Sequence, residues 1–136
     1  MNNCIFCKII KGEIPSAKIY EDNEFLAFLD IRPLNKGHAL VITKKHSETI
    51  MDISEEEICR MMAVIKKIMH AISSAIAPDG FNVFCNNKPA AGQEVPHIHF
   101  HVAPRFKNDG HTFKWSHGTY KEGEMEEIKK KIVKFL

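Results

Sequence analysis

Apolar and polar residues alternate along several short segments of the chain, which is the pattern of strands that bury one face. The alternation is clearest over residues 18–21, 24–30, 38–43 and 97–103, and residues 81–85 are a fifth candidate. Because side chains on a strand point alternately to its two faces, each segment can turn its apolar residues towards one core. The pattern predicts a sheet of about five strands.

A long amphipathic helix is predicted between the segments 38–43 and 81–85. Ser54 followed by Glu57 is a capping-box pattern for its start, and Pro78 and Gly80 end it. Apolar residues recur between them at steps of three and four residues, at Ile58, Met61, Met62, Ile65, Ile68, Met69, Ile72 and Ile76. We therefore expect this stripe to pack on the sheet as core.

A second helix is predicted at the C-terminal end of the chain. Met125, Ile128, Ile132 and Phe135 have helical spacing and follow the breaker Gly123. Short strands on both sides of one long helix predict the α+β class, with an antiparallel sheet, one long central helix and a C-terminal helix. A chain of this length fits a single domain over residues 1–136, in which residues 107–136 form a C-terminal extension that ends in the helix.

Charge and composition argue against nucleic acid and membranes as partners and suggest a cellular location. The formal net charge of +2 is too small to indicate nucleic-acid binding, and the basic run 129–131 is interpreted as a solvated helix face. Residues 1–11 contain no long apolar stretch, so we expect neither a signal peptide nor a membrane span. Four cysteines, two of them the close pair Cys4 and Cys7, suit a reducing compartment. The expected location is the cytoplasm, with the nucleus as an alternative.

The run His97-Ile-His99-Phe-His101 carries the strongest chemical signal. On a strand these three imidazoles would project together from one face, while the apolar residues between them point into the core. The residues leave three interpretations open. The histidines are separate buried groups with separate partners, or ligands of an open zinc site, or a cluster in which crowding keeps one imidazole neutral as a nucleophile towards phosphorus.

This run resembles the signature of the histidine triad (HIT) family, in its bacterial-type and nucleotide-binding branches. The similarity extends over residues 4–15, 25–31, 37–46 and 86–105, in the family's order. The resemblance implies a HIT-like fold and a hydrolase or nucleotidyl transferase that acts at the α-phosphate of nucleoside monophosphate derivatives. Those substrates are phosphoramidates, aminoacyl adenylates or dinucleoside polyphosphates. The rival interpretation is a nucleotide-binding regulatory module whose turnover is incidental.

The resemblance also implies the roles of the histidines. His99 attacks the α-phosphorus and forms a nucleotidyl-histidine intermediate, while its other ring nitrogen donates to a backbone carbonyl, expected to be that of His97. His101 contacts the phosphate or the bridging oxygen, and His38 supports it. The implied catalytic set is therefore His99, His101, His38 and His97, and the implied chemistry requires no metal.

A site for purine nucleotides such as AMP or GMP follows from the same resemblance. Asp30 takes the ribose hydroxyls. The phosphate-binding loop contributes Asn86, Gly92, Gln93 and Glu94, and Glu94 stands where close relatives often carry a serine or threonine. The apolar cleft for the base contains Ile5, Phe6, Ile9, Phe28 and Ile31. Without the family, Asp30 is a turn former, residues 86–93 are a polar turn and the apolar residues are plain core.

Cys4 and Cys7 have the spacing that lets two thiolates reach one ion, which is half of a tetrahedral site. The resemblance to some branches of the family completes the site with His46 and His97 and implies a structural zinc ion. Cys59 and Cys85 are interpreted as core thiols. The family also implies a homodimer, with no nucleic-acid partner and no membrane partner.

Overall fold

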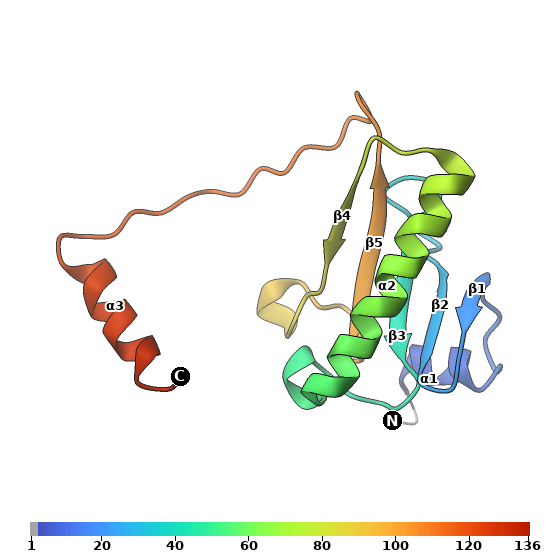
Figure 1. The fold of residues 1–136 in the computed structure, drawn as a ribbon, viewed down its shortest axis with the longest axis horizontal. Coiled ribbons are helices and arrows are strands. Elements are labelled where there is room, and N and C mark those ends of the chain that lie inside the picture. The colour runs from blue at the N-terminus through green and yellow to red at the C-terminus, as the bar shows by residue number, and fades with distance from the viewer. Residues whose placement is uncertain (1–2) are drawn as a thin grey trace.

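The computed structural model describes residues 3–136. A five-stranded antiparallel sheet forms the centre of the fold, with its strands in the order β1-β2-β3-β5-β4. The long helix α2 crosses one face of the sheet (Figure 1). The elements along the chain are α1 (Ile5–Ile10), β1 (Lys18–Glu21), β2 (Phe25–Leu29), β3 (Ala39–Thr43), α2 (Glu55–Ile76), β4 (Gly80–Phe84), β5 (His99–Arg105) and α3 (Glu124–Val133), with short 3-10 turns at Ile50–Asp52 and Pro89–Ala91. The predicted α+β class is confirmed.

The first helix, α1, was not predicted from the sequence. Its six residues are too few for an apolar period to be recognised. Cys4 caps its start, because the Cys4 thiol accepts a hydrogen bond from the Cys7 amide at 3.4 Å. Phe6 and Ile9 are its buried residues. The helix therefore depends on packing against the sheet more than on its own length.

The ends of α2 lie close to their predicted positions. The Ser54 hydroxyl accepts a hydrogen bond from the Glu57 amide at 3.1 Å, which is one half of the predicted capping box. The full reciprocal arrangement lies earlier in the chain, between Thr49 and Asp52 at the 3-10 turn. At its other end, α2 stops at Ala77, whose φ of 46° is left-handed. Pro78 follows directly, so the chain cannot continue the helix.

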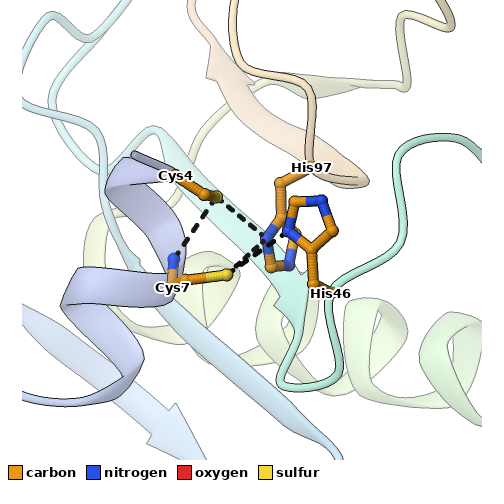
Figure 2. A group of neighbouring side chains, drawn as sticks. All are labelled: Cys4, Cys7, His46 and His97. Carbon is orange, nitrogen blue, oxygen red and sulfur yellow. Dashed lines mark hydrogen bonds between the residues drawn. The ribbon is translucent and has the colours of Figure 1, made fainter. Parts of the chain in front are cut away.

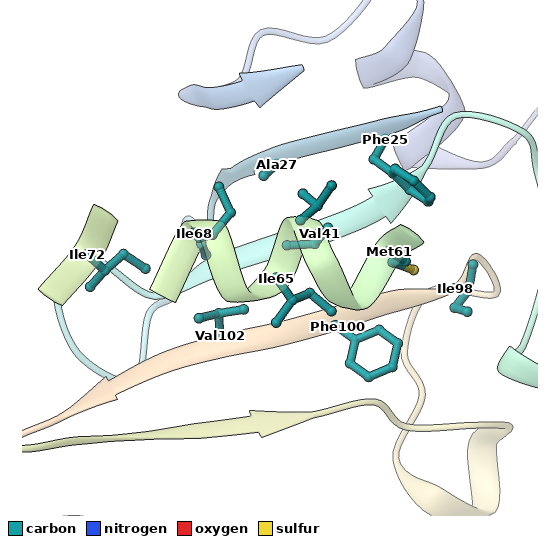
Figure 3. Close-up of a cluster of buried hydrophobic side chains, with 12 residues drawn as sticks. Phe25, Ala27, Val41, Met61, Ile65, Ile68, Ile72, Ile98, Phe100 and Val102 are labelled. Atoms are coloured by element: carbon teal, nitrogen blue, oxygen red, sulfur yellow. The ribbon is translucent and has the colours of Figure 1, made fainter. Parts of the chain in front are cut away.

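The larger core lies between α2 and the sheet (Figure 3). It contains Met61, Ile65, Ile68 and Ile72 from the helix, and the helix-facing residues of β2, β3 and β5. Each fully buried side chain of this size contributes about 1.5–3 kcal/mol. The predicted stripe was too wide: Met62 and Ile76 are 44% and 41% exposed, because they lie beside the face of α2 that contacts the sheet rather than on it.

A smaller core lies on the opposite face of the sheet. Phe6 and Ile9 of α1 pack there against Leu26, Phe28, Leu40 and Ile42 of β2 and β3. The two faces of the sheet are therefore covered to different extents. One face is sealed by α2, whereas α1 covers only part of the other and leaves room beside it.

The chain leaves the sheet after β5. Residues 111–121 have no regular secondary structure and lead to α3, which stands clear of the sheet (Figure 1). From Gly110 onwards every residue except Glu124 is exposed, including Trp115 and the apolar side of α3. Within residues 3–136, no helix combines the length and the apolar character needed to cross a membrane.

Candidate active site

His99 and His101 project from β5 on the face that α1 partly covers. In the pairing of β3 with β5, Ile42 lies opposite His99 and Leu40 lies opposite His101, and both apolar partners belong to the smaller core. Ile98, Phe100 and Val102 point to the other face and belong to the core under α2, as predicted. The alternation of the sequence therefore places these two imidazoles correctly.

His97 precedes the strand and contacts a different set of side chains. Strand β5 begins only at His99, because residues 95–98 turn before it: the His97 amide donates to the Val95 carbonyl and the Ile98 amide to the Ser47 carbonyl. The His97 side chain is fully buried beside Cys4. His97 lies on the side of the sheet that α1 covers, with its ring centroid 5.8 Å from that of Phe6, but its Nδ1 atom faces the Cys4 thiol. The three histidines of the run therefore do not form a common metal site, which removes the open-zinc interpretation.

The backbone fixes the tautomer of His99. Its Nδ1–H donates to the His97 carbonyl oxygen at 2.7 Å, which is the contact expected from the sequence. The Nε2 atom therefore carries the free lone pair. Burial lowers the pKa of His99, although the hydrogen bond to His97 and the charges of Asp30 and Glu94 act in the opposite direction. A neutral imidazole with an available lone pair is the form that can act as a nucleophile.

A chain of hydrogen bonds fixes the tautomers of His38 and His101. The Leu34 amide donates to Nδ1 of His38 at 3.0 Å, so Nε2 of His38 carries the proton. That Nε2 atom lies 3.0 Å from Nδ1 of His101, to which it donates. Nε2 of His101 then keeps its own proton and is a donor. Burial and the neighbouring histidines lower the pKa of His101 to about 4, and burial lowers the pKa of His38.

A cleft of about 610 Å³ opens beside these histidines. Its volume lies within the range of small-molecule sites. It is lined by His38, His99 and His101 and by most of the predicted nucleotide-site residues, namely Ile5, Phe6, Ile9, Phe28, Asp30, Ile31, Asn86, Gly92 and Glu94. Ile31 lies at the rim, with 94% of its surface exposed. Elements from four parts of the chain thus converge on one cavity.

Gln93 does not line the cleft. Its side-chain Nε2 donates to the carbonyl oxygens of Glu48 and Val95, at 2.7 and 3.0 Å, and its Oε1 accepts from the Lys88 amide at 2.6 Å. Gln93 is 7% exposed. Its amide therefore braces the loop between β4 and β5, residues 85–98, from the inside. In this loop, Gly92 has a φ of 89°, which favours glycine.

The sequence did not reveal two further residues of the cleft. Phe84, at the end of β4, stacks on the His101 ring with a centroid distance of 4.4 Å and an interplanar angle of 9°. Arg32, in the loop after β2, reaches Glu94 on the opposite rim. Phe84 could have been found from its place in the alternating segment 81–85. Nothing in the sequence pairs Arg32 with a residue so far along the chain.

Cys4, Cys7, His46 and His97 form a second group of side chains, the Cys/His cluster (Figure 2). Nδ1 of His97 lies 3.3 Å from the Cys4 sulfur, and Nδ1 of His46 lies 3.3 Å from the Cys7 sulfur. The four ligand atoms all lie within 4.8 Å of one another. His97 Nε2–H donates to the Thr43 carbonyl at 2.8 Å, so its Nδ1 lone pair faces the thiols. The cluster could hold a metal ion.

The remaining cysteines differ from each other. Cys85 is half-buried and packs against the core under α2, and burial raises the pKa of its thiol. Cys59 is exposed on α2, so its prediction as a core thiol was wrong. Its position on the helix lies outside the stripe that faces the sheet.

Residues 11–108 match the model of the HIT domain family. The antiparallel α+β fold and the cleft that His38, His99 and His101 line are those of a HIT domain. The chain is a member of the HIT family, close to bacterial HIT-like proteins and to histidine triad nucleotide-binding proteins.

Its relatives cover most of its length. An uncharacterised HIT-like protein of Methanocaldococcus jannaschii is 46% identical over 129 residues, 95% of this chain and 98% of that protein. A crystal structure of a HIT family member from Bacillus subtilis has a TM-score of 0.89 and 44% identity, and the match covers 98% of this chain and 97% of that chain.

Two other relatives are an enzyme with a named activity and a protein with a bound metal. The adenosine 5'-monophosphoramidase of Schizosaccharomyces pombe is 46% identical over 103 residues, 76% of this chain and 74% of that protein. A zinc-bound histidine triad family protein of Mycobacterium smegmatis has a TM-score of 0.77 and 41% identity, with 86% of this chain and 85% of that chain covered.

Proposed function

We propose that this protein is a nucleotide-binding hydrolase or nucleotidyl transferase that acts at the α-phosphorus of nucleoside monophosphate derivatives. The observation that carries the proposal is the His99 tautomer: the hydrogen bond from Nδ1 to the His97 carbonyl leaves the Nε2 lone pair beside the cleft. The monophosphoramidase of Schizosaccharomyces pombe supports phosphoramidates as one substrate class, with aminoacyl adenylates and dinucleoside polyphosphates as the others.

The reaction takes two steps. In the first step, the His99 Nε2 lone pair forms a bond to phosphorus, and the bond from phosphorus to the leaving group breaks. The leaving group departs with the bonding pair and takes a proton from water. In the second step, water attacks phosphorus and gives one proton to the hydroxide left by the first step, His99 departs with its electron pair and the nucleoside monophosphate is released. The Nε2–H of His101, fixed through His38, is a donor for a phosphate oxygen throughout.

The rest of the cleft accounts for purine nucleotides such as AMP or GMP. The base lies among Ile5, Phe6 and Phe28, where burial and ring contacts supply the binding energy. The Asp30 carboxylate accepts from the ribose hydroxyls. The loop between β4 and β5 receives the phosphate, with Asn86 and the backbone near Gly92 as its donors.

The Cys/His cluster is the proposed site of a structural zinc ion. Two thiolates and two imidazoles are a donor set that zinc prefers, and the zinc-bound relative of Mycobacterium smegmatis supports this choice of metal. Four protein ligands leave no position for water, so a zinc ion held there supplies structural stability and no catalysis. Catalysis by His99 then requires no metal.

The working form is a homodimer of single-domain protomers. The C-terminal extension, residues 107–136, exposes the apolar residues of α3 and finds no packing on its own protomer (Figure 1). Such a surface is typical of a protein interface.

The test of the proposed function is hydrolysis of a fluorogenic adenosine phosphoramidate, measured with and without a chelator that has access to the Cys/His cluster. We expect AMP as the product. The initial rate of turnover, measured before the chelator can unfold the protein, should be the same with and without the chelator and should not depend on added metal. If the nucleotide binds but is released unchanged, the protein is a nucleotide-binding module and the proposal fails.

A further inference from the structure

An exposed ion pair joins the two polar rims of the cleft. Nη2 of Arg32, in the loop after β2, lies 3.3 Å from Oε2 of Glu94, in the loop between β4 and β5. Both residues line the cleft. Their side chains are 82% and 79% exposed, so the pair is weakly held and opens at little cost. A charged group that enters the cleft can therefore replace either partner.

The carboxylate of Glu94 lies in the same cleft as His99. Glu94 also lines a smaller cavity of about 440 Å³, which shares Ile5 and Val95 with the main cleft. A group that leaves a phosphorus atom held by His99 therefore departs within the field of this carboxylate.

The other charges around the smaller cavity are balanced. Its second acidic residue, Glu48, is paired with Lys88 at 3.0 Å and does not line the main cleft. Within the lining of the main cleft, Asp30 uses Oδ1 to accept from the Arg32 amide and places Oδ2 at 3.8 Å from His38. Glu94 is therefore the acidic side chain that can change its partner when a leaving group is present.

We propose that Glu94, with Arg32, selects the charge of the leaving group and favours an amine that carries a positive charge near the phosphoramidate nitrogen. This inference rests on the proposed function. A cationic leaving group replaces Arg32 beside Glu94, whereas an anionic leaving group is repelled by the carboxylate until Arg32 turns towards it. As the bond from phosphorus to nitrogen breaks, the nitrogen takes the bonding pair and one proton from water and leaves as a neutral amine. A second proton from water then gives the ammonium form, which increases the positive charge beside Glu94.

The experiment uses three adenosine phosphoramidates of similar size, with aminoethyl, propyl and carboxyethyl groups on the nitrogen. For each protein, kcat/KM is divided by the value for the propyl compound, which cancels any general change in His99 reactivity. Wild type should prefer the aminoethyl compound. Glu94→Gln should lower the ratio of aminoethyl to carboxyethyl rates by about three- to fivefold, the size expected for an exposed charge. Arg32→Gln should raise it, and added salt should reduce the wild-type preference.

Glu48→Gln is the matched control, because it removes the same charge outside the main cleft. Its ratio should equal that of wild type. A ratio that Glu94→Gln leaves unchanged, or that Glu48→Gln changes as strongly, overturns the inference while turnover itself upholds the proposed function. If wild type hydrolyses none of the three compounds, the proposed function fails and the inference fails with it.

Discussion

At the scale of single residues, the backbone decides what each histidine can do. The His97 carbonyl holds Nδ1–H of His99, the Leu34 amide holds Nδ1 of His38, and the Thr43 carbonyl holds Nε2–H of His97. Each contact leaves the other nitrogen in a defined state. The same residue type therefore offers a free Nε2 lone pair in His99, an Nε2–H donor in His101 and an Nδ1 lone pair that faces the thiols in His97.

The buried pair His38 and His101 predicts a pH-dependent stability. Both have a lowered pKa in the folded state, about 4 for His101, so below the ordinary value of 6.5 the unfolded chain binds more protons than the folded one. The free energy of unfolding should be highest above pH 6.5 and should fall as the pH decreases towards 4. Asp30, at 3.8 Å from His38, reduces the effect but does not reverse it.

Urea unfolding of wild type and His101→Gln between pH 5 and pH 7.5 measures this slope, since every other titrating group affects both proteins alike. The slope of the variant should be smaller by up to about 1.4 kcal/mol per pH unit. His117→Gln, in the exposed C-terminal extension, is the control and should retain the wild-type slope. Identical slopes for wild type and His101→Gln would show that His101 binds its proton equally well in the folded and unfolded states, so that folding does not lower its pKa.

At the scale of elements, the sequence predicted the five strands and both longer helices, because their apolar residues recur at strand or helix spacing over enough residues to be recognised. It could not predict α1, whose six residues pack through contacts with distant strands. The turn before β5 directs His97 to the thiols instead of the cleft, and it depends on a hydrogen bond from the Ile98 amide to the Ser47 carbonyl, which the alternation does not reveal. The inward side chain of Gln93 depends on Glu48 for the same reason.

Helix α1 connects the two sites. It carries Cys7 to the Cys/His cluster and contributes Ile5, Phe6 and Ile9 to the cleft. The Phe6 ring also lies edge-on to His99, with a centroid distance of 5.1 Å. A change in the cluster should therefore change the wall of the cleft that α1 forms.

Cys7→Ser tests this connection. Loss of one ligand should loosen α1, so amide hydrogen exchange in residues 4–10 should become faster and the Kd for AMP should rise about tenfold, equivalent to about 1.4 kcal/mol. Calorimetry and hydrogen exchange measure the two effects. Cys59→Ser, on the exposed side of α2, is the matched control. Wild-type exchange and affinity in Cys7→Ser would mean that α1 holds its position without the cluster.

At the scale of the whole molecule, the exposed surface is large for the mass. The chain exposes 9710 Å² at 15.5 kDa. A compact folded monomer of this mass exposes about 7,200 Å². The excess arises in the C-terminal extension, where Trp115 is 74% exposed and Ile132 of α3 is 56% exposed. The difference is about 2,500 Å² for one chain, and two copies that buried it would reach the upper end of the total area that obligate dimers bury.

The extension should therefore pack on a second copy of the chain. Light scattering after gel filtration should give twice the mass of one chain for wild type. Ile128→Gln together with Ile132→Gln should shift the protein towards the monomer, because both residues lie on the apolar side of α3. Lys130→Gln, on the same helix, should leave the dimer intact. A monomeric wild type would contradict the homodimer directly.

In the proposed mechanism, His99 becomes covalently bound to the nucleotide. Rapid quenching of wild type, His99→Asn and His117→Asn after mixing with an adenosine phosphoramidate, followed by intact-protein mass spectrometry, tests it most directly. We expect an acid-labile adenylyl adduct on wild type and on His117→Asn, mapped to residue 99, and neither adduct nor turnover for His99→Asn. Turnover by His99→Asn at the wild-type rate, or an adduct on another residue, would contradict the mechanism.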